Sequence, residues 1–141
     1  RGMAFAAKGQ LADAEIELAS LRKVAADPGL KFNLFSTNTG DAILAVAPEM
    51  LAGDLAARRK DFERAIAHLD RGVRLEDSLS YTEPTEYPYP VRQLLGSVLL
   101  EAGRAREAEV VYWGYCPNCA ETAATKTTET SPKVSTKSPT T

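Results

Sequence analysis

The stretch that decides the fold is residues 60–77, KDFERAIAHLDRGVRLED. Its apolar side chains recur at the three- and four-residue spacing of a helix with one buried face. These side chains are Phe62, Ala65, Ile66, Leu69, Val73 and Leu75. Asp61 stands just before them and suits an N-cap, although Arg64 rather than a glutamate follows three residues later. We therefore expect a helix over residues 61–76.

The same periodicity appears in other segments of the chain. It predicts helices at residues 10–26, 41–59, 91–102 and 104–115. Pro48 lies inside the second of these and removes one ladder hydrogen bond, so that segment either kinks or divides into two helices. We expect the kink, because no turn residue adjoins Pro48.

Two connecting segments interrupt the helical pattern. Residues 27–38 contain Pro28 and Gly29, which stop the preceding helix. Residues 78–90 contain prolines every few positions together with three tyrosines. Proline favours extended backbone, so we expect this second loop to be ordered but not helical.

Composition excludes several classes of protein. The chain has 141 residues, 44% of them apolar and 26% charged, which is the balance of a single globular domain. A net charge of −2 lacks the basic excess of a nucleic-acid-binding protein. The sequence contains no apolar run of about 18 residues, so no membrane-spanning helix is expected.

The two ends of the chain have a distinct character. Arg1 is not a start methionine and the helical pattern is already running at Gly2, so we expect the sequence to begin inside a helix, as a fragment or a processed product would. Half of residues 120–141 are threonine or serine, and Val134 is the only branched aliphatic residue there. We expect residues 116–141 to form a disordered tail, either a solvated segment without a role or an O-glycosylated stalk.

The chain also repeats itself. Counting from a small residue taken as origin, each copy places a turn residue at +7 and an alanine at +12, with apolar residues at +16. The origins are Gly2, Gly53 and Gly96; the turn residues are Gly9, Lys60 and Gly103; the alanines are Ala14, Ala65 and Ala108. Small residues let two helices approach closely, and glycine permits the left-handed backbone of a short reversal. Each helix pair has an apolar face that it cannot cover alone, so the pairs are expected to stack.

This pattern resembles the tetratricopeptide repeat. The resemblance covers about residues 1–115 and rests on residues 60–77 and on motif positions in each copy. Those positions are Gly2, Phe5, Gly9 and Ala14; Gly53, Ala65 and Leu69; and Gly96, Leu99, Gly103, Ala108 and Tyr112. The copies depart from the family in having origins 51 and 43 residues apart instead of about 34. They also depart in having Lys60 at a turn.

The resemblance implies an all-α fold of antiparallel helix pairs stacked as a short right-handed solenoid. The copies would lie near residues 1–26, 41–77 and 90–115. The alternative is an irregular array of helical hairpins of another kind. After residue 115 no amphipathic capping helix appears, so an apolar face is expected at the end of the stack. That face comprises Val110, Val111, Tyr112, Trp113 and Tyr115.

The chain offers little for catalysis. Cys116 and Cys119 form a lone Cys-x-x-Cys, which would need ligands from elsewhere to complete a zinc site and an adjoining strand to act as a thioredoxin-like pair. His68 has Arg64 and Arg71 near it on the same helix, so we expect a partly exposed helix residue rather than a general base. Phosphate-binding loops and nucleophile motifs are missing from the sequence. We expect no enzyme activity, no cofactor and no metal.

The resemblance implies a binding groove instead, lined by the first helix of each pair. Its positions one, four and five past the small residue are Met3, Ala6 and Ala7; Asp54, Ala57 and Arg58; and Ser97, Leu100 and Glu101, with Met50 and Gln93 beside them. The Lys/Asn clamp that some family members use for a terminal carboxylate is not reproduced, because Met3, Asp54 and Ser97 stand where asparagine would be wanted. The loop tyrosines Tyr81, Tyr87 and Tyr89 either cover one end of the groove or form a strap between copies.

The sequence therefore predicts a module that binds a protein or peptide, without nucleic-acid or membrane partners, and cytoplasmic by default. The residues expected at the partner are Met50, Asp54, Arg58, Gln93, Ser97, Glu101, Tyr81, Tyr87 and Tyr89. Arg58 would pair with an acidic group of the ligand. Two alternatives are a structural unit that self-associates through the apolar face at residues 110–115, and an accessory domain of a larger enzyme.

Overall fold

The structure is a computed structural model that describes residues 1–32 and 37–113. Within these residues every regular element is a helix and no strand is present, which confirms the prediction of an all-α chain. The elements are α1 (Gly2–Ala7), α2 (Leu11–Ala25), the 3-10 helix η1 (Pro28–Leu30), α3 (Gly40–Arg58), α4 (Phe62–Asp77), α5 (Val91–Glu101) and α6 (Ala105–Trp113). The predicted tail, Tyr115 and the cysteine pair lie outside the described residues.

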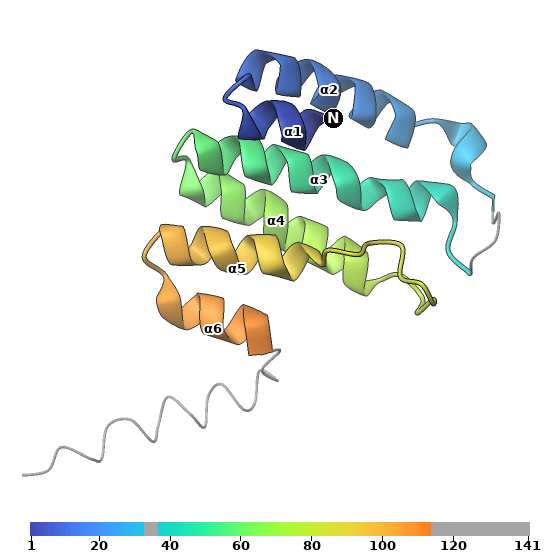
Figure 1. Ribbon diagram of the computed structural model, residues 1–141. Coiled ribbons are helices and arrows are strands. Elements are labelled where there is room, and N and C mark those ends of the chain that lie inside the picture. The colour runs from blue at the N-terminus through green and yellow to red at the C-terminus, as the bar shows by residue number, and fades with distance from the viewer. Residues whose placement is uncertain (33–36, 114–141) are drawn as a thin grey trace, which may run out of the picture.

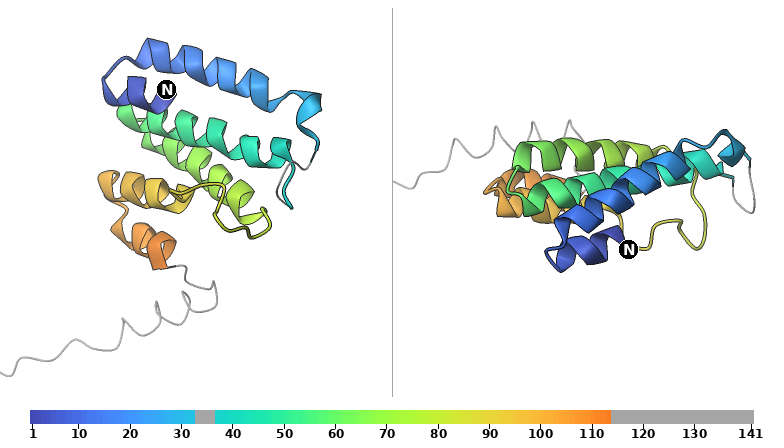
Figure 2. Two further views of the ribbon diagram at one scale, coloured as in Figure 1. Left: turned by 45° about the vertical axis from the view of Figure 1, so that its right-hand side comes forward. Right: turned by 90° about the horizontal axis from the view of Figure 1, so that it is seen from above.

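The helices pack in chain order as antiparallel pairs. α1 packs on α2, α3 on α4 and α5 on α6, and each pair also contacts the next through α2–α3 and α4–α5. The first helices contact one another as well, α1 with α3 and α3 with α5. Figure 1 shows the three tight turns at one edge of the molecule and the two long loops at the opposite edge. Seen from above, α1 and α4 lie on opposite sides of α3 (Figure 2).

The three tight turns share one backbone geometry. Gly9 and Gly103 have φ of 77°, and Lys60 has φ of 61°, so all three turn positions are left-handed. In the first turn, Gly9 N–H donates to Ala6 and Gln10 N–H donates to Phe5, both at 3.0 Å. The corresponding pairs recur in the other two turns, namely Lys60–Ala57, Asp61–Ala56, Gly103–Leu100 and Arg104–Leu99. This is the Schellman arrangement, and it satisfies carbonyls that the end of the helix would leave unpaired.

The small residues lie at close contacts between helices, as the sequence predicts. Ala14, Ala65 and Ala108 are at most 1% exposed. A Cβ on Gly53 would lie 2.5 Å from Leu69 Cγ, and a Cβ on Gly96 would lie 2.4 Å from Tyr112 Cζ. A side chain at either origin would therefore force Leu69 or Tyr112 of the facing helix to shift. Gly2 differs, because its nearest neighbour is Leu51 Cδ2 of α3, at 2.4 Å.

The helix boundaries follow local signals. Asp61 caps α4, since its Oδ1 accepts from Arg64 N–H at 3.3 Å. Residues Gly40–Arg58 form one helix with Pro48 buried inside it, so the alternative of two separate helices is wrong. Residues 78–90 are ordered and not helical, as predicted.

The opposite edge is held by side chains that reach between the two long loops. The Asn38 amide donates to the Ser80 carbonyl at 2.8 Å and to Glu86 Oε1 at 3.0 Å. Its oxygen accepts from Ser80 N–H at 2.7 Å. Asn38 is 7% exposed, so these bonds satisfy a buried amide and join two loops that are distant in sequence.

The start of α5 is capped from another helix. Pro90 offers no side-chain cap, and Glu76 Oε2 of α4 accepts from Val91 N–H at 2.9 Å instead. Burial of the Glu76 carboxylate is the main cause that raises its pKa above the ordinary value.

Candidate partner-binding groove

A hollow of about 480 Å³ opens beside the turn ends of α1, α3 and α5. Its walls come from these three helices, from the turns after α1 and α3, and from Leu11 at the start of α2. The lining residues are Ala6, Ala7, Gly9, Leu11, Asp54, Ala57, Arg58, Lys60, Leu94, Ser97, Val98 and Glu101. Seven of the nine first-helix positions that the sequence predicts are among them, and Met3 and Leu100 are not.

The repeat offsets recur in this lining. Position five past the small residue supplies Ala7, Arg58 and Glu101, one from each first helix. Position four supplies Ala6 and Ala57, and position one supplies Asp54 and Ser97. Residues at equivalent positions of three helices therefore line one hollow. This shared position relative to the origin glycine brings together residues that are more than 40 positions apart in the sequence.

Two ion pairs set the charge of the hollow. Arg58 Nε lies 3.0 Å from Asp54 Oδ2 on the same helix, and the Asp54 side chain is 9% exposed. Lys60 pairs with Glu101 across to α5. Arg58 therefore already has an acidic partner within the chain. Because the Arg58 side chain is 37% exposed, the outer edge of its guanidinium can still donate to a ligand.

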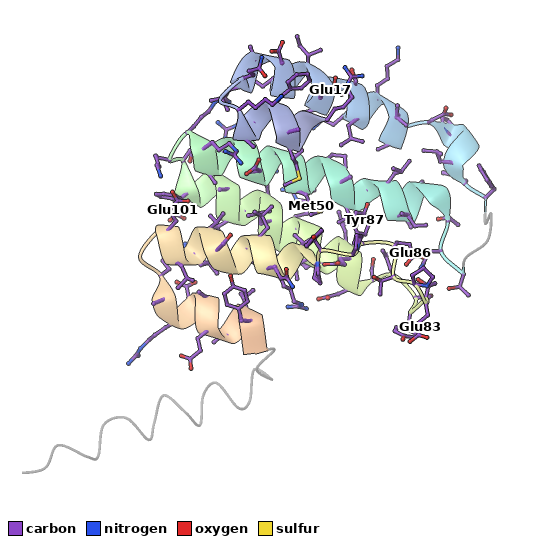
Figure 3. The ribbon with its side chains drawn as sticks, viewed as in Figure 1. Glu17, Met50, Glu83, Glu86, Tyr87 and Glu101 are labelled. Atoms are coloured by element: carbon purple, nitrogen blue, oxygen red, sulfur yellow. The ribbon has the colours of Figure 1, made fainter. Side chains whose placement is uncertain are left out.

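The remaining predicted residues lie elsewhere. Figure 3 shows Glu101 near the turn edge, Met50 in the middle of α3, and Tyr87 and Glu86 near the loop edge. Met50 and Gln93 do not line the hollow, and neither do the three tyrosines. Tyr81 and Tyr87 instead line a separate hollow of about 310 Å³ between the 78–90 loop and the end of α4. The structure thus places part of the predicted set in each hollow and leaves Met50, Gln93 and Tyr89 outside both.

Tyr87 ties its loop to the core. It is half-buried, it packs against the larger core cluster, and its hydroxyl donates to the Ile43 carbonyl of α3 at 2.5 Å. Burial raises the pKa of Tyr87 to about 12. Tyr81 and Tyr89 are 77% and 74% exposed, so they are available at the surface. Tyr87 therefore has the contacts of a strap.

Several residues were not predicted as structurally important. Asn38 is one, because nothing local marks a polar loop residue as a link between loops. Glu49 is another: its Oε2 lies 2.7 Å from His68 Nδ1, and its Oε1 lies 3.5 Å from Arg71. His68 is partly exposed, as expected, but it contacts a carboxylate from α3. Arg64 and Arg71, at i−4 and i+3 on the same helix, give no sign that His68 has a carboxylate partner on another helix.

Within residues 1–32 and 37–113, no group of three or more histidine, cysteine, aspartate or glutamate side chains is placed to hold a metal ion. Among the described helices, none combines the length and the apolar character needed to cross a bilayer.

Comparisons with known proteins add no family. No protein-family model matches the chain, and no match is found among curated proteins or solved structures.

Proposed function

We propose that the chain is a non-enzymatic helical repeat module, similar to tetratricopeptide repeats, that binds a peptide or protein in the hollow beside α1, α3 and α5. The observation that supports it best is the shared register of the lining, because Ala7, Arg58 and Glu101 stand at the same offset in three helices. In this proposal the three pairs stack as a short solenoid, and the hollow is part of its concave face.

The chemistry of the hollow indicates the kind of ligand it takes. Ala6, Ala57 and Val98 give it shallow apolar walls, while Arg58 and Glu101 place one charge of each sign near its rim. Small apolar side chains of an extended segment fit such walls. Polar groups of that segment can then exchange hydrogen bonds with Arg58 and Ser97.

The test is to fill the hollow without removing an ion pair. Ser97 lies on an exposed part of α5 that lines it, so Ser97→Trp places a large side chain in the space. Peptides selected from a random display library with the unmodified chain are measured against both proteins by fluorescence anisotropy. We expect Ser97→Trp to weaken binding about tenfold or more, which corresponds to at least about 1.4 kcal/mol.

The matched control is Ser20→Trp, which makes the same change at an exposed position of α2 outside the hollow. It should leave the affinity unchanged. Selected peptides that bind the Ser97→Trp protein as tightly as the unmodified chain would reject the groove, as would a library from which no peptide is enriched.

A second candidate function is that of a self-associating structural unit. It is favoured by the exposure of apolar side chains on the last described helix, where Val110 is 41% and Tyr112 is 47% exposed. Light scattering over a hundredfold range of concentration distinguishes it from a monomeric binding module.

A further inference from the structure

The outer face of α6 differs from the equivalent faces of α2 and α4. Nine residues after each left-handed turn residue stand Leu18, Leu69 and Tyr112. Leu18 and Leu69 are 8% and 0% exposed, whereas Tyr112 is 47% exposed. Tyr112 packs over Gly96 just as Leu69 packs over Gly53, so both side chains make the same contact with the first helix of their own pair. Tyr112 lacks the second contact, which Leu69 makes with the first helix of the following pair.

The first helix of the following pair covers the equivalent leucines. Leu18 belongs to one buried cluster with Leu51 and Leu55 of α3. Leu69 belongs to another buried cluster with Leu95 and Val98 of α5. In both junctions, apolar residues just before and just after the origin glycine of the covering helix complete the burial. The chain thus contains two examples of what covers this position.

Where one pair contacts the next, the residue six positions after the turn also matches in polarity the residue that faces it from the covering helix. Six residues after each turn residue stand Glu15, Ile66 and Glu109. Glu15 Oε1 lies 2.7 Å from Arg59 Nη2, which projects from the end of the covering helix α3. At the α4–α5 junction the counterpart of Arg59 is Ala102, opposite an apolar Ile66. Glu109 is exposed, and no described basic side chain forms an ion pair with it.

From this register we infer that the outer face of α6, centred on Tyr112 and Glu109, binds an amphipathic helix of another protein. That helix carries apolar residues four apart and a basic residue four positions further on, as Leu51, Leu55 and Arg59 do in α3. Its apolar residues cover Tyr112, and its basic residue pairs with Glu109. This surface lies on a different helix from the proposed groove, and the inference does not depend on the groove.

Two other occupants fit the face less well. Residues 114–141 contain Val134 as their only branched aliphatic residue, so they lack the apolar spacing of the covering helices. A second copy would bring Lys8, the counterpart of Arg59, to Glu109. However, Ala4 is the counterpart of Leu55 in α1, so a second copy would offer only a small apolar side chain to cover Tyr112. Both occupants are outcomes of the test below.

The probe is a fluorescently labelled peptide of this chain's own residues 40–60, with Pro48→Ala to favour an isolated helix. It is titrated with the full chain and followed by anisotropy. We expect saturable binding, weakened about twofold to fivefold by Glu109→Lys in the protein. Arg59→Glu in the peptide should weaken binding to the unmodified chain by a similar factor and restore binding to the Glu109→Lys protein.

Glu15→Lys in the protein is the matched control, because a peptide that displaced α3 would contact Glu15 instead of Glu109. It should leave the affinity unchanged. An effect of Glu15→Lys, no effect of Glu109→Lys, or no saturable binding up to about 1 mM overturns the inference.

Two further measurements distinguish the other occupants. A molecular mass that rises with concentration and falls on Glu109→Lys, with rescue by Lys8→Glu, assigns the face to a second copy. Amide hydrogen exchange that shows protection of residues 114–141 in the full chain, lost when the peptide is added, assigns it to the chain's own C-terminal residues. Either result overturns the separate helical partner.

Discussion

The two edges of the molecule are built in opposite ways. At the turn edge, the three reversals at Gly9, Lys60 and Gly103 repeat one hydrogen-bond pattern within a few residues, even though one of them is a lysine. At the loop edge, Asn38 reaches Ser80 and Glu86, which lie 42 and 48 residues away. Tyr87 reaches Ile43 at a separation of 44. Local backbone rules make the first edge, and a few buried polar contacts make the second.

The largest expected effect is at the loop edge. Asn38→Asp keeps the shape of the side chain but places a carboxylate against the Ser80 carbonyl and beside Glu86, where the amide now donates. Loss of two donors in a buried site should lower the free energy of unfolding by about 3 kcal/mol. Urea denaturation at pH 7 measures it. Gln93→Glu makes the same chemical change at an exposed position and should cost almost nothing; a loss below about 1 kcal/mol for Asn38→Asp would show that the loops do not depend on this amide.

The next effect is at the turn edge. Gly103→Ala meets no atom within 4 Å, so its cost is that of a side chain in the left-handed region alone. We expect a loss of about 1–2 kcal/mol in thermal or urea unfolding, and the same for Gly9→Ala. Gly103→Asn should cost less, because asparagine tolerates this backbone better. Equal losses for alanine and asparagine would point to a cause other than φ.

Tyr87→Phe is a smaller change at the loop edge. It removes the hydroxyl that donates to Ile43 and should cost about 1 kcal/mol at pH 7. Tyr89→Phe, at an exposed position, is the control.

The pH dependence of the same pair sharpens the comparison. The pKa of Tyr87 is raised to about 12 in the folded chain from the ordinary tyrosine value of 10.0, so the unfolded chain loses this proton first. Stability from Tyr87 is therefore complete below pH 10 and falls as the pH rises toward 12. The fall should be smaller in Tyr87→Phe than in the unmodified chain. Parallel curves for the two proteins in urea titrations between pH 9 and about 11 would contradict the burial of the Tyr87 hydroxyl.

The smallest expected change in the free energy of unfolding is at the turn edge, at Lys60. Lys60→Gly relieves the left-handed strain but loosens the unfolded chain and removes the exposed Lys60–Glu101 pair, so a net gain of about 0.5 kcal/mol is expected. Lys60→Ala loses the same ion pair and keeps the strain. The glycine variant should exceed the alanine variant by about 1 kcal/mol in the free energy of unfolding; equal stabilities would mean that Lys60 is not strained.

The candidate groove was predictable to the extent that it depends on helical register. Ala7, Arg58 and Glu101 line one hollow because equal offsets from a packed glycine place side chains on equivalent faces of α1, α3 and α5, and α3 contacts both of the other two helices. Met50 and Gln93 were predicted from the same pattern, but they lie outside the hollow, nearer the loop edge of their helices. The offset from the origin glycine defines the face of a helix on which a residue lies. It does not define how far along that face the neighbouring helices enclose a hollow.

The loop tyrosines were predicted as a group and the structure separates them. Tyr87 is half-buried with its hydroxyl on α3, while Tyr81 and Tyr89 are exposed. All three stand in the same proline-rich composition, so the sequence contains no signal that distinguishes them. Only the path of the loop across α3 selects the one that is buried.

By itself, the sequence determined the helices, the tight turns and the small residues at the helix contacts, because periodicity, glycine and alanine act on neighbours within a few turns of the same chain segment. Even the lysine at the second turn was evident from its offset. The tertiary structure alone decided that Asn38 joins two loops, that Glu49 meets His68, that Arg58 is already paired with Asp54 and that Tyr112 is left uncovered. Each of these depends on which distant atoms arrive at a position. That is a property of the packed molecule, which no local pattern of residues encodes.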